Sequence, residues 1–245
     1  PGYALACFIF RFLRRPLIGS HSRLGNPDQT LDTLLANIIA SSAIEGERLN
    51  AQSVRSSLAR RLGGSETQSY PVSDRSEGLA AMMLDAIDNH EQPLTIERLY
   101  QWHRWLFPAN EWSVQRLNVG QLRGDEPMQV VSGRVDRPIV HFEAPPRATL
   151  DDQLADFTLW FNQTRHDPTI DPLLRAAICH LWFLTLHPVD DGNGRLARAL
   201  TDLALSQADS HSMRLYAMPV AILELRGDYY PVSYTHLRAH ETDSY

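Results

Sequence analysis

The chain has 245 residues, a formal net charge of -6, and a composition that is 43% apolar and 21% charged. This is ordinary for a globular domain, and the mildly acidic balance argues against nucleic acid as a partner. The sequence contains no lysine, so all 23 basic residues are arginines. The catalytic or phosphate-binding lysines of P-loop proteins, protein kinases and pyridoxal enzymes are therefore excluded. Any phosphate must be bound by arginines and backbone amides.

Two cysteines, Cys7 and Cys179, lack the spacing of metal ligands. They predict unpaired thiols in a reducing compartment, and we therefore expect a cytoplasmic protein. An apolar run at 4–10 is too short to cross a bilayer, so no membrane partner is expected. Because residue 1 is proline, we expect a fragment of a longer chain. The run 232–242 resembles the translation of a transposase adapter used in DNA library preparation, and residues 231–245 are set aside as a sequencing artefact.

The pattern of apolar residues predicts a mainly α protein, because most segments show helical spacing. Between the fourth and fifth helices, the β-prone runs 128–131 and 139–142 flank a turn-rich connection and predict a β-hairpin. No repeat of fixed period is visible. The expected helices are 30–43, 50–62, 77–89, 95–107, 150–162, 171–187 and about 195–208.

The stretch 187–198 carries the chemistry of the chain. Pro188 predicts that a helix ends at His187, because proline disfavours helical geometry in the residue before it. The run Gly192-Asn193-Gly194 allows a tight turn and a close approach of backbone to ligand. The next helix then begins with unpaired N–H groups and a positive dipole end, which together favour an anion.

Four side chains in this stretch fit attack on a phosphate. Arg195 and Arg198 lie one helical turn apart and can reach the same anion. Asp191 is a hard oxygen ligand suited to Mg²⁺, and His187 can accept a proton near neutral pH. A capping role for His187 is the structural alternative. A dinucleotide fingerprint is rejected, because a helix precedes the glycines where that motif needs a strand.

The stretch resembles the signature of the Fic family, His-Pro-Phe-x-Asp/Glu-Gly-Asn-Gly-Arg-x-x-Arg, with Val189 in place of phenylalanine. Upstream, Ser41-Ser42-Ala43-Ile44-Glu45-Gly46 resembles the inhibitory motif of that family. The runs 47–49 and 54–63 are similar to bacterial Fic proteins whose inhibitory helix precedes the catalytic core. The resemblance covers about residues 30–230. It implies a Fic-type helical bundle with a hairpin flap, an N-terminal helical region at 1–75 and a catalytic domain at 76–230.

By this resemblance the protein is a self-inhibited adenylyltransferase, which moves AMP from ATP to a Ser, Thr or Tyr hydroxyl of a target protein. The implied ligands are ATP and Mg²⁺, and the flap at 128–142 would pair with an extended segment of the target. The implied roles are His187 as general base, Asp191 as metal ligand, Gly192, Asn193 and Gly194 as the lining of the anion hole, and Arg195 and Arg198 as ligands of the β and γ phosphates.

The inhibitory motif, whose matching positions are Ser41, Glu45 and Gly46, implies that Glu45 pairs with Arg198. A carboxylate that engages the guanidinium fork with both oxygens would exclude the γ-phosphate from it. Val189 in place of phenylalanine would leave a smaller plug and loosen the loop, at a cost of ~1–3 kcal/mol.

Three alternatives stay open on the sequence alone. The same site could remove AMP from a modified protein, transfer another phosphate-containing group, or bind a nucleotide without turnover. Neither the target protein nor the oligomeric state can be derived from the residues, and an oligomer is compatible with them.

Overall fold

The structure, a computed structural model, describes residues 27–63, 70–109, 117–134, 137–208 and 218–224. Cys7, the apolar run at 4–10 and the adapter-like segment lie outside the described residues, as does most of the polar segment after Gly63. The helices are α2 (Pro27–Ile44), α3 (Ala51–Arg61), α4 (Asp74–Asp88), α5 (Ile96–Leu106), α6 (Arg147–Gln163), α7 (Pro172–Leu186), α8 (Asn193–Ala208) and α9 (Met218–Glu224), with a 3₁₀ turn, η1, at Thr164–His166.

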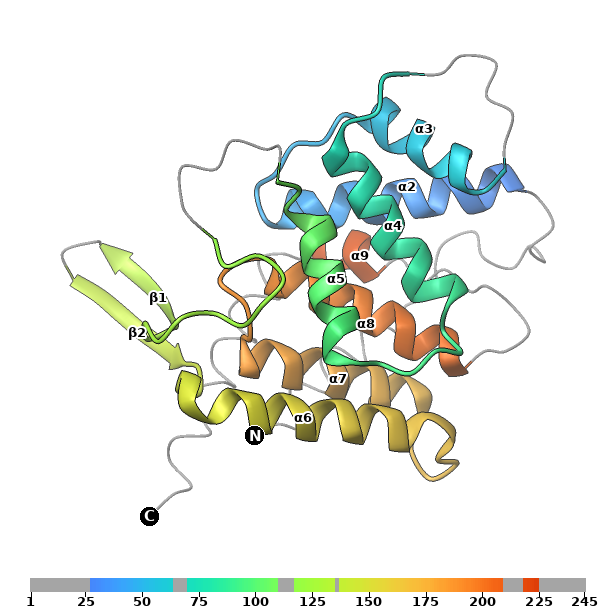
Figure 1. Cartoon of the computed structure of the whole chain (residues 1–245). Coiled ribbons are helices and arrows are strands. Elements are labelled where there is room, and N and C mark those ends of the chain that lie inside the picture. The colour runs from blue at the N-terminus through green and yellow to red at the C-terminus, as the bar shows by residue number, and fades with distance from the viewer. Residues whose placement is uncertain (1–26, 64–69, 110–116, 135–136, 209–217, 225–245) are drawn as a thin grey trace.

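The protein is mainly α, as the sequence predicts, and α8 forms its centre. This helix packs against α7, α4, α5 and α2, and almost all of its residues are buried. Helix α6 lies against the other side of α7, while α2 and α3 pack together at the opposite end of the bundle (Figure 1). Because the core surrounds α8, the residues at the start of this helix are held in place.

Polar caps explain where four of the eight described helices begin. The side chains of Asn50, Thr95 and Asp171 accept hydrogen bonds from backbone amides in the first turns of α3, α5 and α7. These caps place the helix starts where the sequence predicts them. Helix α4 begins at Asp74, three residues before the expected start, because the Ser73 hydroxyl caps it. The short elements η1 and α9 were not predicted.

The predicted hairpin consists of the antiparallel strands β1 (Gln129–Arg134) and β2 (Arg137–Glu143). Both strands are longer than expected, so the connection between them shrinks to 135–136. The register changes at Val130 and Val131, which leaves one extra residue on β2 as a bulge. Figure 1 shows the hairpin at one side of the bundle, next to the loop that follows α7.

Cys179 and His180 of α7 are buried core residues, and Cys179 is a free thiol, as the sequence predicts. Burial raises the pKa of Cys179 to about 12 and lowers the pKa of His180 to about 3. The His180 Nδ1 donates to the Thr201 hydroxyl at 3.1 Å, because that hydroxyl already donates to a backbone carbonyl. Among the described helices, none combines the length and the apolar character that crossing a bilayer requires.

Candidate active site

His187 caps the C-terminus of α7 in a left-handed backbone conformation, with φ 47° and ψ 56°. Within the described ranges it is the only non-glycine residue with positive φ. The sequence predicts the end of the helix here but not the left-handed turn. Such a conformation costs on the order of 1–3 kcal/mol and persists only where surrounding contacts hold it. One of these contacts is the His187 amide, which donates to the Phe183 carbonyl at 3.1 Å.

The tautomer of the His187 ring follows from its contact with the Leu184 carbonyl, which lies 3.4 Å from Nδ1. A carbonyl only accepts, so Nδ1 carries the proton and Nε2 keeps the lone pair. Burial lowers the pKa of His187; the contact with Leu184 raises it, Arg123 lowers it, and Asp191 and Glu45 raise it. The net direction is downward, so the ring is neutral at pH 7, as a base must be.

The loop between α7 and α8 is fastened by the Asn193 side chain. Its Nδ2 donates to the Val189 carbonyl at 2.7 Å, and its Oδ1 accepts from the Val189 amide at 3.2 Å. The Asn193 side chain therefore holds the loop, and only its backbone is left for an anion. Val189 is buried in the core and fixed by both bonds. Gly192 has φ +87°, and a Cβ there would lie 3.0 Å from the Phe107 ring.

The two neighbouring aspartates have different surroundings. The Asp190 Oδ2 accepts from the Asn118 amide at 2.8 Å, which ties this carboxylate to the loop before the hairpin. The Asp191 side chain is 55% exposed, with Oδ1 2.6 Å from the Gly192 amide and 3.5 Å from Nη2 of Arg195. An open carboxylate at the start of a helix fits Mg²⁺, which commonly takes one or two carboxylates with phosphate oxygens. The described residues contain no cluster of three or more His, Cys, Asp or Glu that could hold a metal.

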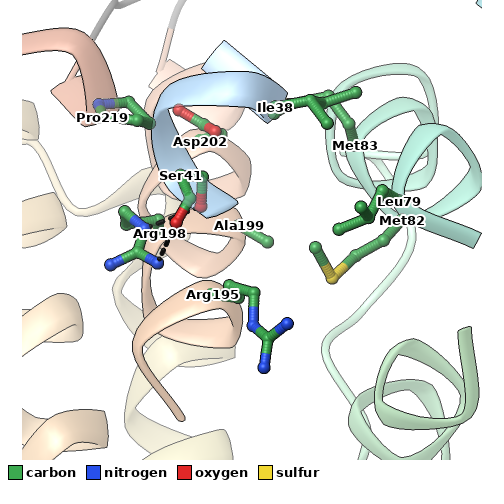
Figure 2. A pocket seen from close by; sticks show the side chains of 10 residues that line it. All are labelled: Ile38, Ser41, Leu79, Met82, Met83, Arg195, Arg198, Ala199, Asp202 and Pro219. Atoms are coloured by element: carbon green, nitrogen blue, oxygen red, sulfur yellow. Dashed lines mark hydrogen bonds between the residues drawn. The ribbon is translucent and has the colours of Figure 1, made fainter. Parts of the chain in front are cut away.

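Arg198 is buried and bound by the end of α2. Its Nε donates to the Ser41 hydroxyl at 2.8 Å, and its Nη2 donates to the Ser41 carbonyl at 3.0 Å and to Glu45 Oε1 at 2.7 Å. Figure 2 shows Arg198 reaching Ser41 across the contact between α8 and α2. Glu45 thus engages the guanidinium through one oxygen, not through both as the sequence analysis assumed. Ser41 accepts the hydrogen bonds from Nε and from the second hydrogen of Nη2.

Gly46 directs the turn after α2 toward α8. It follows α2 in a left-handed conformation, with φ +79°, and the amides of Gly46 and Glu47 donate back to carbonyls of the last turn at 3.0 Å. These two bonds form a Schellman motif, in which glycine is favoured. Across the contact, a Cβ on Gly194 would lie 2.3 Å from Glu45 Oε1. Glycine at 194 therefore leaves the space that the Glu45 carboxylate occupies.

Glu47 is a second carboxylate in the turn after α2, and its contacts were not predicted. Its Oε2 accepts from Arg195 Nη1 at 2.9 Å, and its Oε1 accepts from Arg75 Nε at 2.6 Å. Both guanidinium groups lie over the Phe107 ring, 5.1 and 5.2 Å from its centroid. The turn after α2 therefore holds both arginines of the motif. The only signal in the sequence was a second acidic residue two positions after Glu45.

His103 of α5 connects the motif loop to the loop before the hairpin, and it too was missed. Its Nδ1 accepts from the Gly120 amide at 3.0 Å, so its Nε2 carries the proton and donates to the Asp191 carbonyl at 3.1 Å. The ring is fully buried, and burial lowers its pKa. A neutral His103 therefore fixes the backbone beside the exposed carboxylate of Asp191.

Asp202 follows Arg198 by one helical turn and lines a small cavity with it and Ser41 (Figure 2). The cavity has room for roughly one water molecule. Burial raises the pKa of Asp202 to about 8, while Arg198 lowers it. The Asp202 Oδ2 has no hydrogen-bond partner among the described residues. Nothing in the sequence singles out Asp202.

Two segments of the chain match known protein families. Residues 93–205 match the Fic/DOC family, and residues 9–63 match a domain of unknown function, DUF4172. The chain is 27% identical over 203 residues to protein adenylyltransferase fic-1 of Caenorhabditis elegans, which covers 81% of this chain and 36% of the relative. It is 29% identical over 119 residues to a uridine 5'-monophosphate transferase of Xanthomonas campestris, covering 47% of this chain and 21% of the relative. The chain thus spans only about a third of the length of the Caenorhabditis elegans protein.

The fold resembles that of two solved Fic structures. A Fic family protein from Desulfovibrio desulfuricans aligns over 100% of this chain and 73% of its own, with a TM-score of 0.59 and 20% identity. A Fic domain containing signaling protein from Bacteroides thetaiotaomicron aligns over 85% of this chain and 73% of its own, with a TM-score of 0.51 and 18% identity. Residues 93–205 therefore match the Fic/DOC family, and the fold of the chain resembles these two structures.

Proposed function

We propose that the protein is a self-inhibited adenylyltransferase, which transfers AMP from ATP to a hydroxyl side chain of a target protein. The observation that carries the proposal is the convergence of four groups around the start of α8. Asp191 and Glu45 lie close enough to the His187 ring for their charges to raise its pKa. Glu45 also pairs with Arg198. A base, an exposed carboxylate and two buried arginines therefore meet in one place.

In the proposed reaction, Nε2 of His187 takes the proton of the target hydroxyl. The hydroxyl oxygen forms a bond to the α-phosphorus, and the bond between that phosphorus and the oxygen bridging to the β-phosphate breaks. Pyrophosphate leaves, and AMP stays on the target. His187 can begin this step because its lone pair is on Nε2 and its ring is neutral at pH 7. A Mg²⁺ ion held by Asp191 would neutralise charge on the phosphates.

Arg195 and Arg198 would hold the β and γ phosphates, with help from the backbone amides at the start of α8. Both side chains are buried, at 4% and 3% exposure. A guanidinium with little water around it binds phosphate more strongly than an exposed one. The target would pair with the β1–β2 hairpin through its backbone, which places a hydroxyl near His187. The division of the chain into regions 1–75 and 76–230 belongs to the same proposal.

Self-inhibition would follow from the carboxylates that now occupy the arginines. Glu45 holds Arg198, and Glu47 holds Arg195 together with Arg75. A phosphate cannot use the same donors until a carboxylate leaves. The Glu45 side chain is 33% exposed. Water can therefore solvate this carboxylate when it leaves Arg198.

Incubation with nucleotides and Mg²⁺, followed by intact mass spectrometry, tests the proposal. The wild-type chain and its Glu45→Gly variant would each be given ATP and, separately, UTP, because the relatives include an adenylyl and a uridylyl transferase. We expect a mass gain of one AMP with ATP and no gain with UTP. A gain of one UMP would assign another donor, loss of AMP from a modified protein would indicate removal, and no change would indicate a binding module.

A further inference from the structure

Arg123 is a buried cation whose side-chain donors point at backbone carbonyls. The residue is 2% exposed, its Nε donates to the His187 carbonyl at 2.9 Å, and its Nη2 donates to the Pro145 carbonyl. Its own amide donates to the Pro188 carbonyl at 2.9 Å. A buried guanidinium is costly to desolvate, so an arginine kept here needs a reason beyond packing.

We propose that Arg123 is a positioning residue of the transfer reaction: its side chain joins the base of the hairpin flap to the main chain of His187. The inference rests on the function proposed above. It goes further, because it connects the place where a target would dock with the residue that would take its proton.

The first half of this connection is at His187. Its left-handed turn is an unfavourable conformation for a histidine, and outside contacts must hold it. Arg123 Nε fixes the direction of the His187 carbonyl, and the Arg123 amide fixes the next carbonyl, that of Pro188. Because two consecutive carbonyls are held, the backbone from which the imidazole projects cannot rotate freely.

The second half is at the flap. Pro145 lies two residues after the end of β2, and the Ala144 amide donates to the Met128 carbonyl at 2.8 Å, which closes the hairpin at its base. The Arg123 guanidinium spans from the carbonyl of Pro145 to that of His187. When a target adds a strand to the hairpin, the Arg123 side chain would thus transmit any movement of the hairpin base to His187.

The charge of Arg123 gives this connection a separate signature. Arg123 is among the groups that lower the pKa of His187, alongside the larger effect of burial. Arg123→Gln removes both the charge and the two-carbonyl fork. Arg123→Lys keeps the charge but replaces the planar fork by a single ammonium. The two variants therefore separate geometry from electrostatics.

The test uses the full chain with Glu45→Gly as the parent. Arg147→Gln is the matched control, because Arg147 lies nearby on α6 and pairs with Asp151 on the surface. We expect Arg123→Lys and Arg123→Gln to slow automodification at saturating ATP by about 10- to 100-fold, since small displacements of a reacting group cost that much. The dissociation constant for ATP and the rate of the Arg147→Gln variant should stay within about twofold of the parent, a difference of ~0.4 kcal/mol.

A second readout is a pH titration of ¹⁵N-labelled histidine rings by NMR, with His187 assigned by its loss in His187→Ala. We expect Arg123→Gln to raise the pKa of His187, and Arg123→Lys to change it less. Unchanged rates and an unchanged titration in folded variants would overturn the inference. If the parent itself shows no transfer, the proposed function fails while the titration still tests the coupling. If Arg123→Gln does not fold, Arg123→Lys decides through its rate.

Discussion

Replacing Glu45 with glycine is expected to raise automodification with ATP by about 10- to 100-fold. The Glu45 carboxylate holds Arg198 Nη2 at 2.7 Å, and a hydrogen bond to a charged group contributes ~1.5–3 kcal/mol. Removing it frees the guanidinium for a γ-phosphate without that competition. Transfer of label from α-labelled ATP in a time course measures the rate. Thermal melting of each variant shows whether it remains folded.

Glu47 makes the expected release incomplete in the single variant, because Arg195 stays paired with it at 2.9 Å. The double variant Glu45→Gly with Glu47→Gln should therefore exceed Glu45→Gly. Glu77→Gln is the matched control: this carboxylate has a similar exposure of 34%, and its partners are Arg61 and Ser57 of α3, not an arginine of α8. If Glu45→Gly folds, binds ATP and still shows the wild-type rate, self-inhibition by Glu45 must be abandoned.

Replacing His187 with alanine in the Glu45→Gly chain is expected to abolish transfer. General bases contribute about 10²- to 10⁴-fold to such reactions, so the remaining rate should fall to the detection limit. ATP should still bind, because Arg195, Arg198 and the start of α8 are unchanged. Initial rates and a binding isotherm for the same preparation separate the two effects.

His187→Asn is the matched control for the unusual backbone of this residue. Asparagine tolerates the left-handed conformation that His187 adopts but cannot act as the base. It should keep the loop and lose the reaction. In the parent, the rate should fall as pH drops through the pKa of His187, which burial places below its ordinary value near 6.5. Transfer that persists in both variants would make His187 a structural residue.

Much of the fold could be predicted because it depends on local signals. The caps at Asn50, Thr95 and Asp171 mark helix starts in the sequence, and the structure confirms them. The bulge in β2 could not be predicted, because it depends on how the two strands pair. The left-handed turn of His187 was missed for a similar reason. The local rule for a residue before proline favours extended geometry, and tertiary contacts override it.

The site divides in the same way between local and distant contacts. The motif loop could be read as an anion site because its glycines, carboxylate and arginines lie within one short stretch. Other contacts of the site join residues far apart in the sequence. Glu47 accepts a hydrogen bond from Arg195 across 148 residues, and His103 donates to the Asp191 carbonyl across 88 residues. Arg123 donates to the His187 carbonyl across 64 residues. No local sequence pattern predicts such contacts. The role of the Asn193 side chain could not be derived either, because its partner is the backbone of Val189.

A crystal structure of the Glu45→Gly protein with Mg²⁺ and a non-hydrolysable ATP analogue tests most directly whether these groups share one nucleotide. We expect the γ-phosphate on the Arg198 guanidinium, the β-phosphate near Arg195, and the α-phosphate facing Nε2 of His187. A nucleotide bound away from the start of α8, or an α-phosphate turned from His187 while Arg198 is free, would contradict the proposed transfer.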